Sequence, residues 1–210
     1  MDIGGGYGAT AGWLAAHEGV EVTGFTLSEA QAAVGRTRPG FTCFVRDWLD
    51  NGLPDGAFDR AYAIESSEHM VDKARFFAEA HRVLKPGGRF VVCAWLEGDG
   101  VTHWQVRHLL EPICREGRLP SMGSRADYEA LSAAAGFRLL RYDDISREVR
   151  RTWTICLRRL AGHVFTDREI RHLALSRATE NREFILSLPR LILALRGGAM
   201  RYGVFLWERA

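Results

Sequence analysis

Short apolar stretches alternate with helical patterns through the first hundred residues. Buried strands are predicted at 20–25, 41–45, 58–64 and 89–96, and helices at 9–18, 28–38 and 71–84. This order is typical of a parallel, doubly wound α/β sheet with helices on both faces. With 210 residues, 47% of them hydrophobic, the chain can build one such core, so we expect a single domain over 1–210.

The second half of the chain continues this pattern less regularly. Helices are expected at about 102–116 and 124–135, and strands at 137–143 and 202–207. The segment from about 150 to 195 is rich in helix formers and far exceeds an ordinary connection between a helix and a strand. We therefore expect a helical insertion before the last strand.

A run of glycines, Gly4, Gly5, Gly6 and Gly8, stands between the first strand residues and the first helix. Glycine lets the backbone approach a ligand closely, and the helix start offers free N–H groups, so a nucleotide-like ligand is indicated. Gly4, Gly6 and Ala9 also satisfy the dinucleotide pattern G-x-G-x-x-A. The loop alone leaves both kinds of nucleotide open.

Asp2, which lies just ahead of the glycines, favours one of these two kinds of nucleotide. Asp2 suits the cationic amino group of a methionine moiety and would repel a pyrophosphate. Three further motifs follow in order, and with Asp2 and the glycines they resemble the class I S-adenosylmethionine-dependent methyltransferases: Thr26-Leu27-Ser28-Glu29-Ala30-Gln31, Arg46-Asp47-Trp48 and Leu84-Lys85-Pro86-Gly87-Gly88-Arg89. The run Glu65–Lys73 is most similar to the tocopherol and sterol methyltransferases and their small-molecule relatives. It is also similar to the cyclopropane fatty acid synthase branch.

The resemblance implies a Rossmann-like seven-stranded sheet and S-adenosylmethionine as cofactor. Many relatives, and nicotinamide enzymes too, end the second strand with a ribose-binding acid, but Thr26-Leu27 stand there in this chain. Ser28 and Gln31 either contact the cofactor or form a helix capping box. Asp47 is expected to accept a hydrogen bond from the adenine amino group, with Trp48 beside the ring; otherwise Asp47 is a solvated turn residue. The expected cofactor-binding residues are Asp2, Gly4, Gly5, Gly6, Gly8, Thr26, Leu27, Ser28, Gln31, Asp47, Trp48, Ile64 and Glu65.

Catalysis is expected where the fourth strand ends, because ligands of open α/β sheets bind at the carboxyl ends of strands. Methyl transfer from a sulfonium needs alignment and, for some acceptors, a base. His69 can accept a proton near neutral pH, or it can orient the following helix. Glu68 can act as a base, bind a carbonate-like base, or begin the helix favourably. The pair Glu68 and His69 is predicted to be catalytic.

The predicted function is S-adenosylmethionine-dependent methyl transfer to carbon, oxygen or nitrogen of a mid-sized, largely apolar small molecule. The alternatives are an NAD(P)-dependent oxidoreductase and a non-catalytic binding protein that retains the fold. The insertion at 150–195 either forms a lid over an apolar acceptor pocket or covers the sheet edge. Its arginines at 150–151 and 158–159 either meet an acidic or diphosphate-bearing acceptor or are solvated.

Composition sets the limits on partners and compartment. A net charge of +2, with both signs interspersed, argues against a nucleic-acid partner. The four cysteines are widely spaced, so we expect buried thiols, no metal site and a cytoplasmic protein. No apolar run is long enough for stable membrane insertion. Only residues 1–3 precede the glycines, where a strand of about five residues is usual, so an N-terminally truncated fragment is expected.

Overall fold

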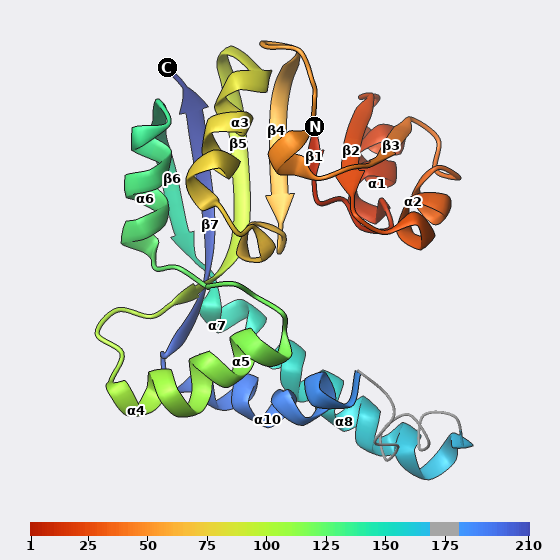
Figure 1. Ribbon diagram of the computed structural model, residues 1–210. Helices are drawn as coiled ribbons and strands as arrows, with labels where there is room; N and C mark the ends of the chain where they lie inside the picture. Colours follow the sequence, from red (N-terminus) through yellow and green to blue (C-terminus); the bar gives the residue numbers. More distant parts are fainter. Residues whose placement is uncertain (169–180) are drawn as a thin grey trace. The chain divides into compact units, whose positions relative to one another are not determined.

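The computed structural model describes residues 1–168 and 181–210 and contains a seven-stranded sheet (Figure 1). The strand order is β3-β2-β1-β4-β5-β7-β6. The strands are β1 (Asp2–Ile3), β2 (Val22–Thr26), β3 (Phe41–Val45), β4 (Phe58–Ile64), β5 (Leu84–Glu97), β6 (Phe137–Asp144) and β7 (Met200–Arg209). Every strand expected from the sequence is present. Most of the observed strand ends differ from the expected ones by a few residues.

The direction of the last strand corrects the expectation of a wholly parallel sheet. β1 pairs in parallel with β2 and β4, β2 with β3, and β4 with β5, whereas β7 is antiparallel. The backbone N–H of Ile145, just after β6, donates to the carbonyl of Tyr202, 3.0 Å away near the start of β7. Because β7 begins where β6 ends, it must run in the opposite direction.

The chain divides into two compact units, each described separately below. The first comprises residues 1–94, 126–143 and 204–210, and the second comprises 95–125 and 144–203. The first unit contains α1 (Ala9–Glu18), α2 (Glu29–Gly35), α3 (Lys73–Val83), nearly all of α6 (Arg125–Ala134), and two 3-10 turns, η1 (Trp48–Asp50) and η2 (Ser67–His69).

Helices α1 and α2 pack against β2 and β3. Gly8 and Gly19, both in the left-handed conformation, bracket α1, and the hydroxyl of Ser28 caps α2 by accepting from the N–H of Gln31 at 3.3 Å. Small helix residues allow close packing against the apolar side chains of the strands. This core consists of Ala11, Val22, Ala32, Phe41 and Cys43.

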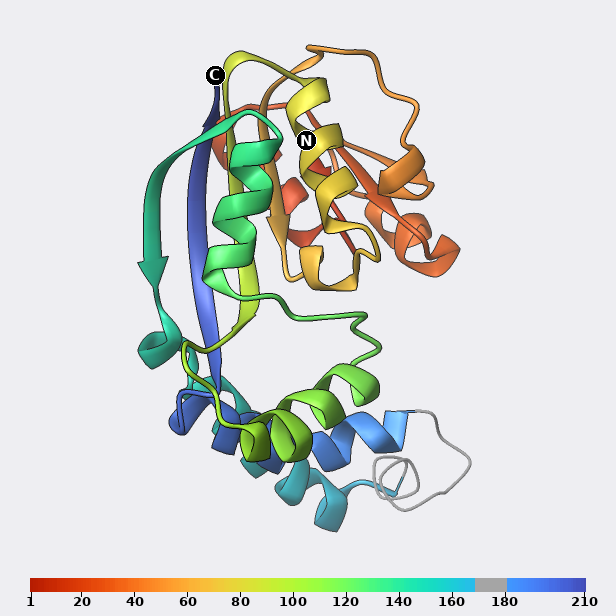
Figure 2. The same cartoon turned by 60° about the vertical axis from the view of Figure 1, so that its left-hand side comes forward.

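Helices α3 and α6 lie side by side on a sheet face (Figure 2). Helix α3 begins at Asp72, whose carboxylate accepts from the N–H of Arg75, and apolar residues at helical spacing face the sheet. An aromatic core joins these elements, with ring centroids 4.7 to 6.2 Å apart for the contacting pairs among Phe77, Phe90, Tyr128, Phe205 and Trp207. Truncating a fully buried aromatic ring costs about 3–5 kcal/mol, so this core holds α3 and α6 firmly against β5 and β7.

The second unit is mostly helical. It contains α4 (His103–Gln105), the π-helical η3 (Val106–Leu110), α5 (Glu111–Glu116), α7 (Ser146–Val149), α8 (Arg151–Thr166) and α10 (Asn181–Arg196). Its buried core includes Leu110, Ile113, Leu191 and Leu195, and Trp153 and Leu157 of α8 pack against it. The expected insertion at 150–195 thus contains α8 and α10; its residues 169–180 lie outside the described part of the chain.

All four cysteines are free thiols. Cys43 is buried, but Cys156 is exposed on α8, so the expectation of buried thiols is wrong at that position. Among the described helices, none has the length and apolar character needed to cross a membrane.

Candidate active site

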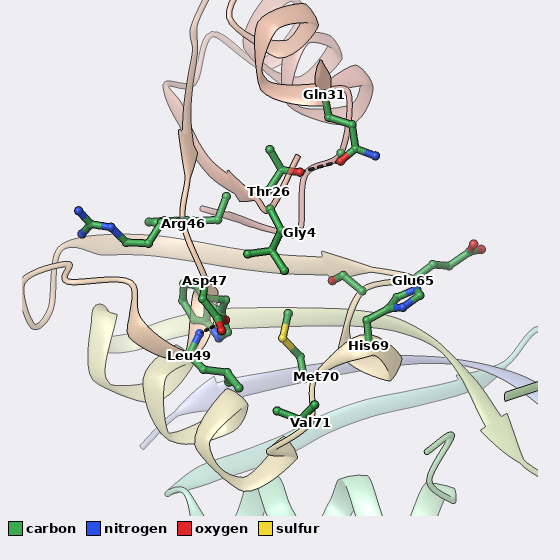
Figure 3. Close-up of a pocket in the computed structure, with 15 residues that line it drawn as sticks. Gly4, Thr26, Gln31, Arg46, Asp47, Leu49, Glu65, His69, Met70 and Val71 are labelled. Atoms are coloured by element: carbon green, nitrogen blue, oxygen red, sulfur yellow. Dashed lines mark hydrogen bonds between the residues drawn. The ribbon is translucent and has the colours of Figure 1, made fainter. Parts of the chain in front are cut away.

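A cavity of about 490 Å³ opens in the first unit where β1, β2 and β4 end (Figure 3). Carboxyl ends of neighbouring parallel strands form the ligand crevice of open α/β sheets. The predicted residues that line the cavity are Gly4, Gly6, Thr26, Leu27, Gln31, Asp47, Trp48, Glu65 and His69. Those that do not line it are Asp2, Gly5, Gly8, Ser28, Ile64 and Glu68.

The glycine loop forms one wall of the cavity. Gly4, Gly6 and Gly8 have φ values of 81°, 52° and 67°, a left-handed conformation that favours glycine. A Cβ on Gly4 would lie 2.5 Å from that of Ser66, and one on Gly8 would lie 2.5 Å from the ring of Phe41. Packing therefore requires glycine at these two positions. A Cβ on Gly6 would meet no protein atom within 4 Å, so Gly6 borders space that a ligand can occupy.

Asp2 lies beneath this loop and not on the cavity surface. Its side chain is 3% exposed, and its carboxylate would be 2.7 Å from a Cβ on Gly5. Burial raises the pKa of Asp2 to about 6, and the hydroxyl of Tyr62 partly offsets that effect. That Asp2 contacts the amino group of a bound methionine moiety stays a prediction. In this structure the glycine loop lies between the Asp2 carboxylate and the cavity.

The segment after β2 has a hydrogen-bond pattern that differs from the expected capping box. The hydroxyl of Thr26 donates to the side-chain oxygen of Gln31 at 2.6 Å and accepts from the N–H of Ser28 at 3.2 Å. Ser28 caps α2, but Gln31 bonds to Thr26 instead of returning to the Ser28 backbone. The predicted cap by Ser28 is therefore present, whereas the predicted return bond from Gln31 is not. Thr26 and Gln31 both line the cavity as a bonded pair.

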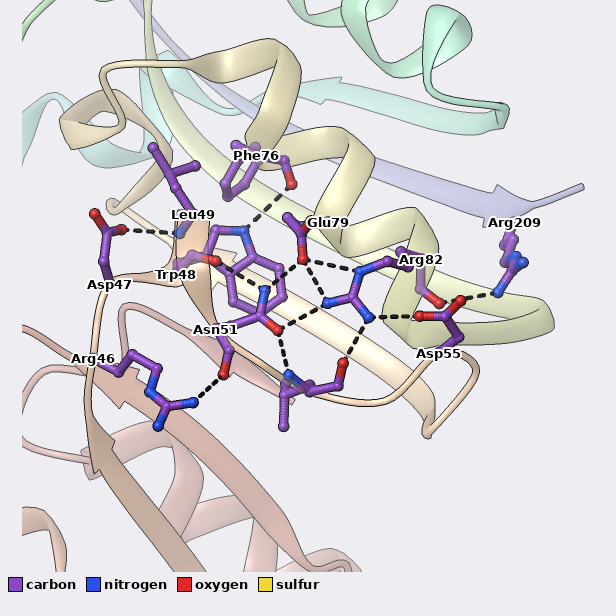
Figure 4. A network of polar contacts seen from close by, with 11 residues as sticks. Arg46, Asp47, Trp48, Leu49, Asn51, Asp55, Phe76, Glu79, Arg82 and Arg209 are labelled. Carbon is purple, nitrogen blue, oxygen red and sulfur yellow. Dashed lines mark hydrogen bonds and ion pairs between the residues drawn. The ribbon is translucent and has the colours of Figure 1, made fainter.

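The turn η1 forms the opposite wall (Figure 4). Asp47 is exposed, and one oxygen of its carboxylate accepts from the N–H of Leu49 at 2.9 Å. Trp48 is only 2% exposed; its indole N–H donates to the carbonyl of Phe76 at 3.4 Å, and its ring meets that of Phe25 edge-on at 5.9 Å. Trp48 is thus part of the core and borders the cavity, whereas Asp47 projects from the turn.

A buried amide holds this turn in place. Asn51 is 2% exposed and donates to the carbonyl of Trp48 at 2.9 Å and to the carboxylate of Glu79 at 2.8 Å. Its side-chain oxygen accepts from the N–H of Leu53 at 2.9 Å and from Arg82 at 3.1 Å (Figure 4). Arg82 also pairs with Glu79 at 2.6 Å. Helix α3 therefore fixes the turn that carries Asp47.

The segment after β4 completes the cavity and separates the two predicted catalytic residues. Glu65 has a φ of 51°, unusual for a residue with a side chain, and the hydroxyl of Ser66 donates to the carbonyl of Ile3. His69 is exposed and lines the cavity (Figure 3). Glu68 is 1% exposed and accepts from the hydroxyl of Ser67 at 3.2 Å.

Tyr128 of α6 extends this buried polar group. Its hydroxyl lies 2.9 Å from that of Ser67, which in turn bonds to Glu68. Burial raises the pKa of Tyr128, and the Glu68 carboxylate raises it further, so the phenol stays protonated and can donate. The chain Tyr128–Ser67–Glu68 anchors η2 to α6, while His69 remains at the cavity.

Comparison with known proteins shows a similarity to methyltransferases. A family model described as a methyltransferase domain matches residues 1–92. The chloroplastic tocopherol O-methyltransferase of Arabidopsis thaliana is 29% identical over 222 residues, covering 100% of this chain and 62% of that relative. The chain is therefore similar to S-adenosylmethionine-dependent methyltransferases, and it spans under two thirds of the curated relative's length.

Solved structures share the fold of this chain. The cyclopropane synthase MmaA2 of Mycobacterium tuberculosis has a TM-score of 0.83 at 26% identity, covering 99% of this chain and 76% of that chain. A geranyl diphosphate C-methyltransferase of Streptomyces coelicolor A3(2), solved with Mg²⁺, geranyl diphosphate and S-adenosyl-L-homocysteine, has a TM-score of 0.76 at 23% identity, covering 100% and 70%.

Six residues that line the cavity were not among the predicted site residues: Phe25, Arg46, Leu49, Ser66, Met70 and Val71. Four of them lie inside the motifs quoted above, Arg46 in one and Ser66, Met70 and Val71 in the run Glu65–Lys73. Phe25 and Leu49 each adjoin a motif, so extending the motifs by one position would have found them.

Proposed function

We propose that the protein transfers a methyl group from S-adenosylmethionine to a mid-sized, largely apolar small molecule. The observation that carries this proposal is the cavity at the carboxyl ends of β1, β2 and β4, with open space beside Gly6 and the carboxylate of Asp47 on the opposite wall. When bound, the cofactor supplies an electrophilic methyl group on a sulfonium. Gly4 and Gly6 would hold it by close backbone approach, and Asp47 would accept a hydrogen bond from its adenine amino group.

The choice of cofactor is supported by the end of β2. A nicotinamide cofactor is usually held there by an acid that binds ribose hydroxyls, whereas this chain has Thr26 and Leu27, with Thr26 bonded to Gln31. Isothermal titration with S-adenosylhomocysteine and, in parallel, with NAD tests the proposal without knowledge of the acceptor. We expect S-adenosylhomocysteine to bind and NAD to bind at least tenfold more weakly. Preference for NAD would contradict the proposal.

We further propose that His69 acts on the acceptor and that Glu68 positions the turn. His69 is exposed at the cavity, while Glu68 is buried behind it against Ser67. A general base contributes about 10²–10⁴-fold to turnover. His69→Ala should therefore slow methyl transfer to a hydroxyl or phenol at saturating cofactor by that factor while leaving the dissociation constant of S-adenosylhomocysteine within about twofold.

A substitution of buried Tyr128 serves as the control for His69→Ala. Tyr128→Phe removes only the hydroxyl that meets Ser67 at 2.9 Å, and it should lower the free energy of unfolding by about 1 kcal/mol with a smaller loss of turnover. If His69→Ala kept wild-type turnover, alignment alone would account for catalysis at this site.

The acceptor and the methylated atom are proposed from the relatives. The names of the relatives include an O-methyltransferase acting on tocopherol and a C-methyltransferase acting on geranyl diphosphate, both with large apolar acceptors. We favour carbon methylation, because the run Glu65–Lys73 resembles a group that includes sterol C-methyltransferases. Transfer of labelled methyl from S-adenosylmethionine to a panel of prenylated phenols and sterols tests the acceptor class, and the position of the label in the product tests the methylated atom. Labelling of only polar acceptors would contradict the first choice, and labelling on oxygen alone would contradict the second.

A further inference from the structure

A second cavity, of about 640 Å³, lies in the helical unit and is lined almost entirely by basic side chains. Arg150, Arg151 and Arg158 come from the start and first half of α8, and Arg196 is the last residue of α10. Helices α8 and α10 pack against each other within this unit (Figure 1). Four guanidinium groups from two helices are thereby brought to one cavity.

The four cavity arginines have no acidic partner among the side chains that the structure describes. Other arginines of the chain do: Arg82, Arg138 and Arg141 each have a carboxylate oxygen 2.6 Å away, and Arg190 pairs with Glu116. The described residues therefore do not neutralise the positive charge of this cavity.

A bound anion would make the charge arrangement of this cavity more favourable. Arg150 is the N-cap and Arg151 the first residue of α8, and no acidic residue occupies the first turn of that helix. Positive charges at a helix N-terminus oppose the helix dipole, and Arg151 and Arg158 lie two turns apart on one face. Like charges that converge on one cavity repel each other unless a bound anion compensates them.

The lining also provides the donors that an anion needs. A guanidinium presents planar N–H groups that bind phosphate oxygens in pairs, and it remains charged at every relevant pH. Thr154 lines the same cavity, and its hydroxyl oxygen is buried with no hydrogen-bond partner among the described residues. A buried hydroxyl without a partner is costly, and rotation of this side chain toward the cavity would let it donate to a bound oxyanion.

We propose that the cavity formed by Arg150, Arg151, Arg158 and Arg196 binds a phosphate-bearing anion. Four positive charges and a volume of about 640 Å³ suit a diphosphate or a phosphorylated headgroup better than a single small ion. The shared chemistry is a phosphate dianion or diphosphate, carried either by a soluble molecule or by an anionic phospholipid. This site is separate from the proposed methyl transfer, and its binding can be measured without any acceptor.

The test compares two neighbouring arginines by titrating the full chain with sodium pyrophosphate at about 0.15 M ionic strength. Arg158→Gln removes a guanidinium of the cavity, whereas Arg159→Gln removes an exposed one of the same helix that does not line the cavity. Both variants lose the same charge at an exposed position, so both should fold. We expect pyrophosphate to bind at least tenfold more weakly to Arg158→Gln and within twofold of wild type to Arg159→Gln.

A second arm identifies the source of the phosphate. Co-sedimentation with vesicles of phosphatidylcholine and phosphatidylglycerol measures headgroup binding by the same three proteins. Loss of vesicle binding in Arg158→Gln alone supports the site and assigns it to a lipid headgroup, while loss of pyrophosphate binding in that variant alone assigns it to a soluble ligand. Equal losses in both variants, or no binding of either probe to the wild type, would overturn the proposal.

Discussion

Gly6→Val separates the structural role of the glycine loop from its role as a ligand cradle. Gly6 has a φ of 52°, and a left-handed backbone costs any residue with a side chain roughly 1–2 kcal/mol of stability. A Cβ at this position meets no protein atom within 4 Å, so the new side chain projects into open space at the cavity. If the cofactor fills that space, forced overpacking costs a further 1–3 kcal/mol, or about 5- to 150-fold in the dissociation constant.

Gly56→Val is the matched control. Gly56 has a φ of 59°, and a Cβ there also meets nothing within 4 Å, but Gly56 does not line the cavity. Urea denaturation should show a similar loss of unfolding free energy in both variants, since both carry the same backbone penalty. Titration with S-adenosylhomocysteine should show weakened binding only in Gly6→Val. Unchanged binding by that variant would refute the assignment of the loop as the cofactor cradle.

Three other substitutions test one residue that lines the cavity and two buried residues behind it. Asp47→Ala should weaken S-adenosylhomocysteine binding by about 1–3 kcal/mol in a titration, whereas Asp50→Ala, an exposed acid of the same turn outside the cavity, should leave it unchanged. Asn51→Ala removes four hydrogen bonds and should cost about 2–4 kcal/mol in urea denaturation; a loss below about 1 kcal/mol would contradict the proposed anchoring of the turn. The raised pKa of Asp2, about 6 against an ordinary 3.8, predicts that its contribution to stability is fully present below about pH 4 and is lost as the pH rises through 6. The difference of about two pKa units corresponds to about 3 kcal/mol, so Asp2→Asn should be stabilised relative to wild type at pH 7 and not at pH 4; equal stabilities at both pH values would contradict the burial argument.

The strands and the glycine loop could be predicted because their signals are local. Period-two apolar stretches and a Ser28 cap depend on residues close in the chain, and the structure places them within a few residues of the expected bounds. The direction of β7 could not be predicted in this way, because alternation of side chains is the same in parallel and antiparallel strands. The contact between Ile145 and Tyr202 decides it, and that contact spans the whole helical segment.

The polar networks could not be predicted from the sequence for a related reason. Asn51 meets Glu79 and Arg82, which are about 30 residues away, and no motif connects these positions. Gln31 has the spacing of a capping box, yet its side-chain oxygen accepts from the hydroxyl of Thr26, which also lines the cavity. Local patterns indicate which groups can form hydrogen bonds; tertiary packing selects the partners.

The different positions of Glu68 and His69 follow from the geometry of a 3-10 turn. With three residues per turn, adjacent side chains point about 120° apart, so Glu68 and His69 of η2 point in different directions. The burial of Ser67 and Glu68 against Tyr128 leaves His69 as the residue of the turn that is exposed at the cavity. A buried carboxylate bonded to a hydroxyl, with a protonated phenol nearby, helps to fix the turn. The sequence predicts Glu68 and His69 as one catalytic pair, and that role stays a prediction; the structure places only His69 at the cavity.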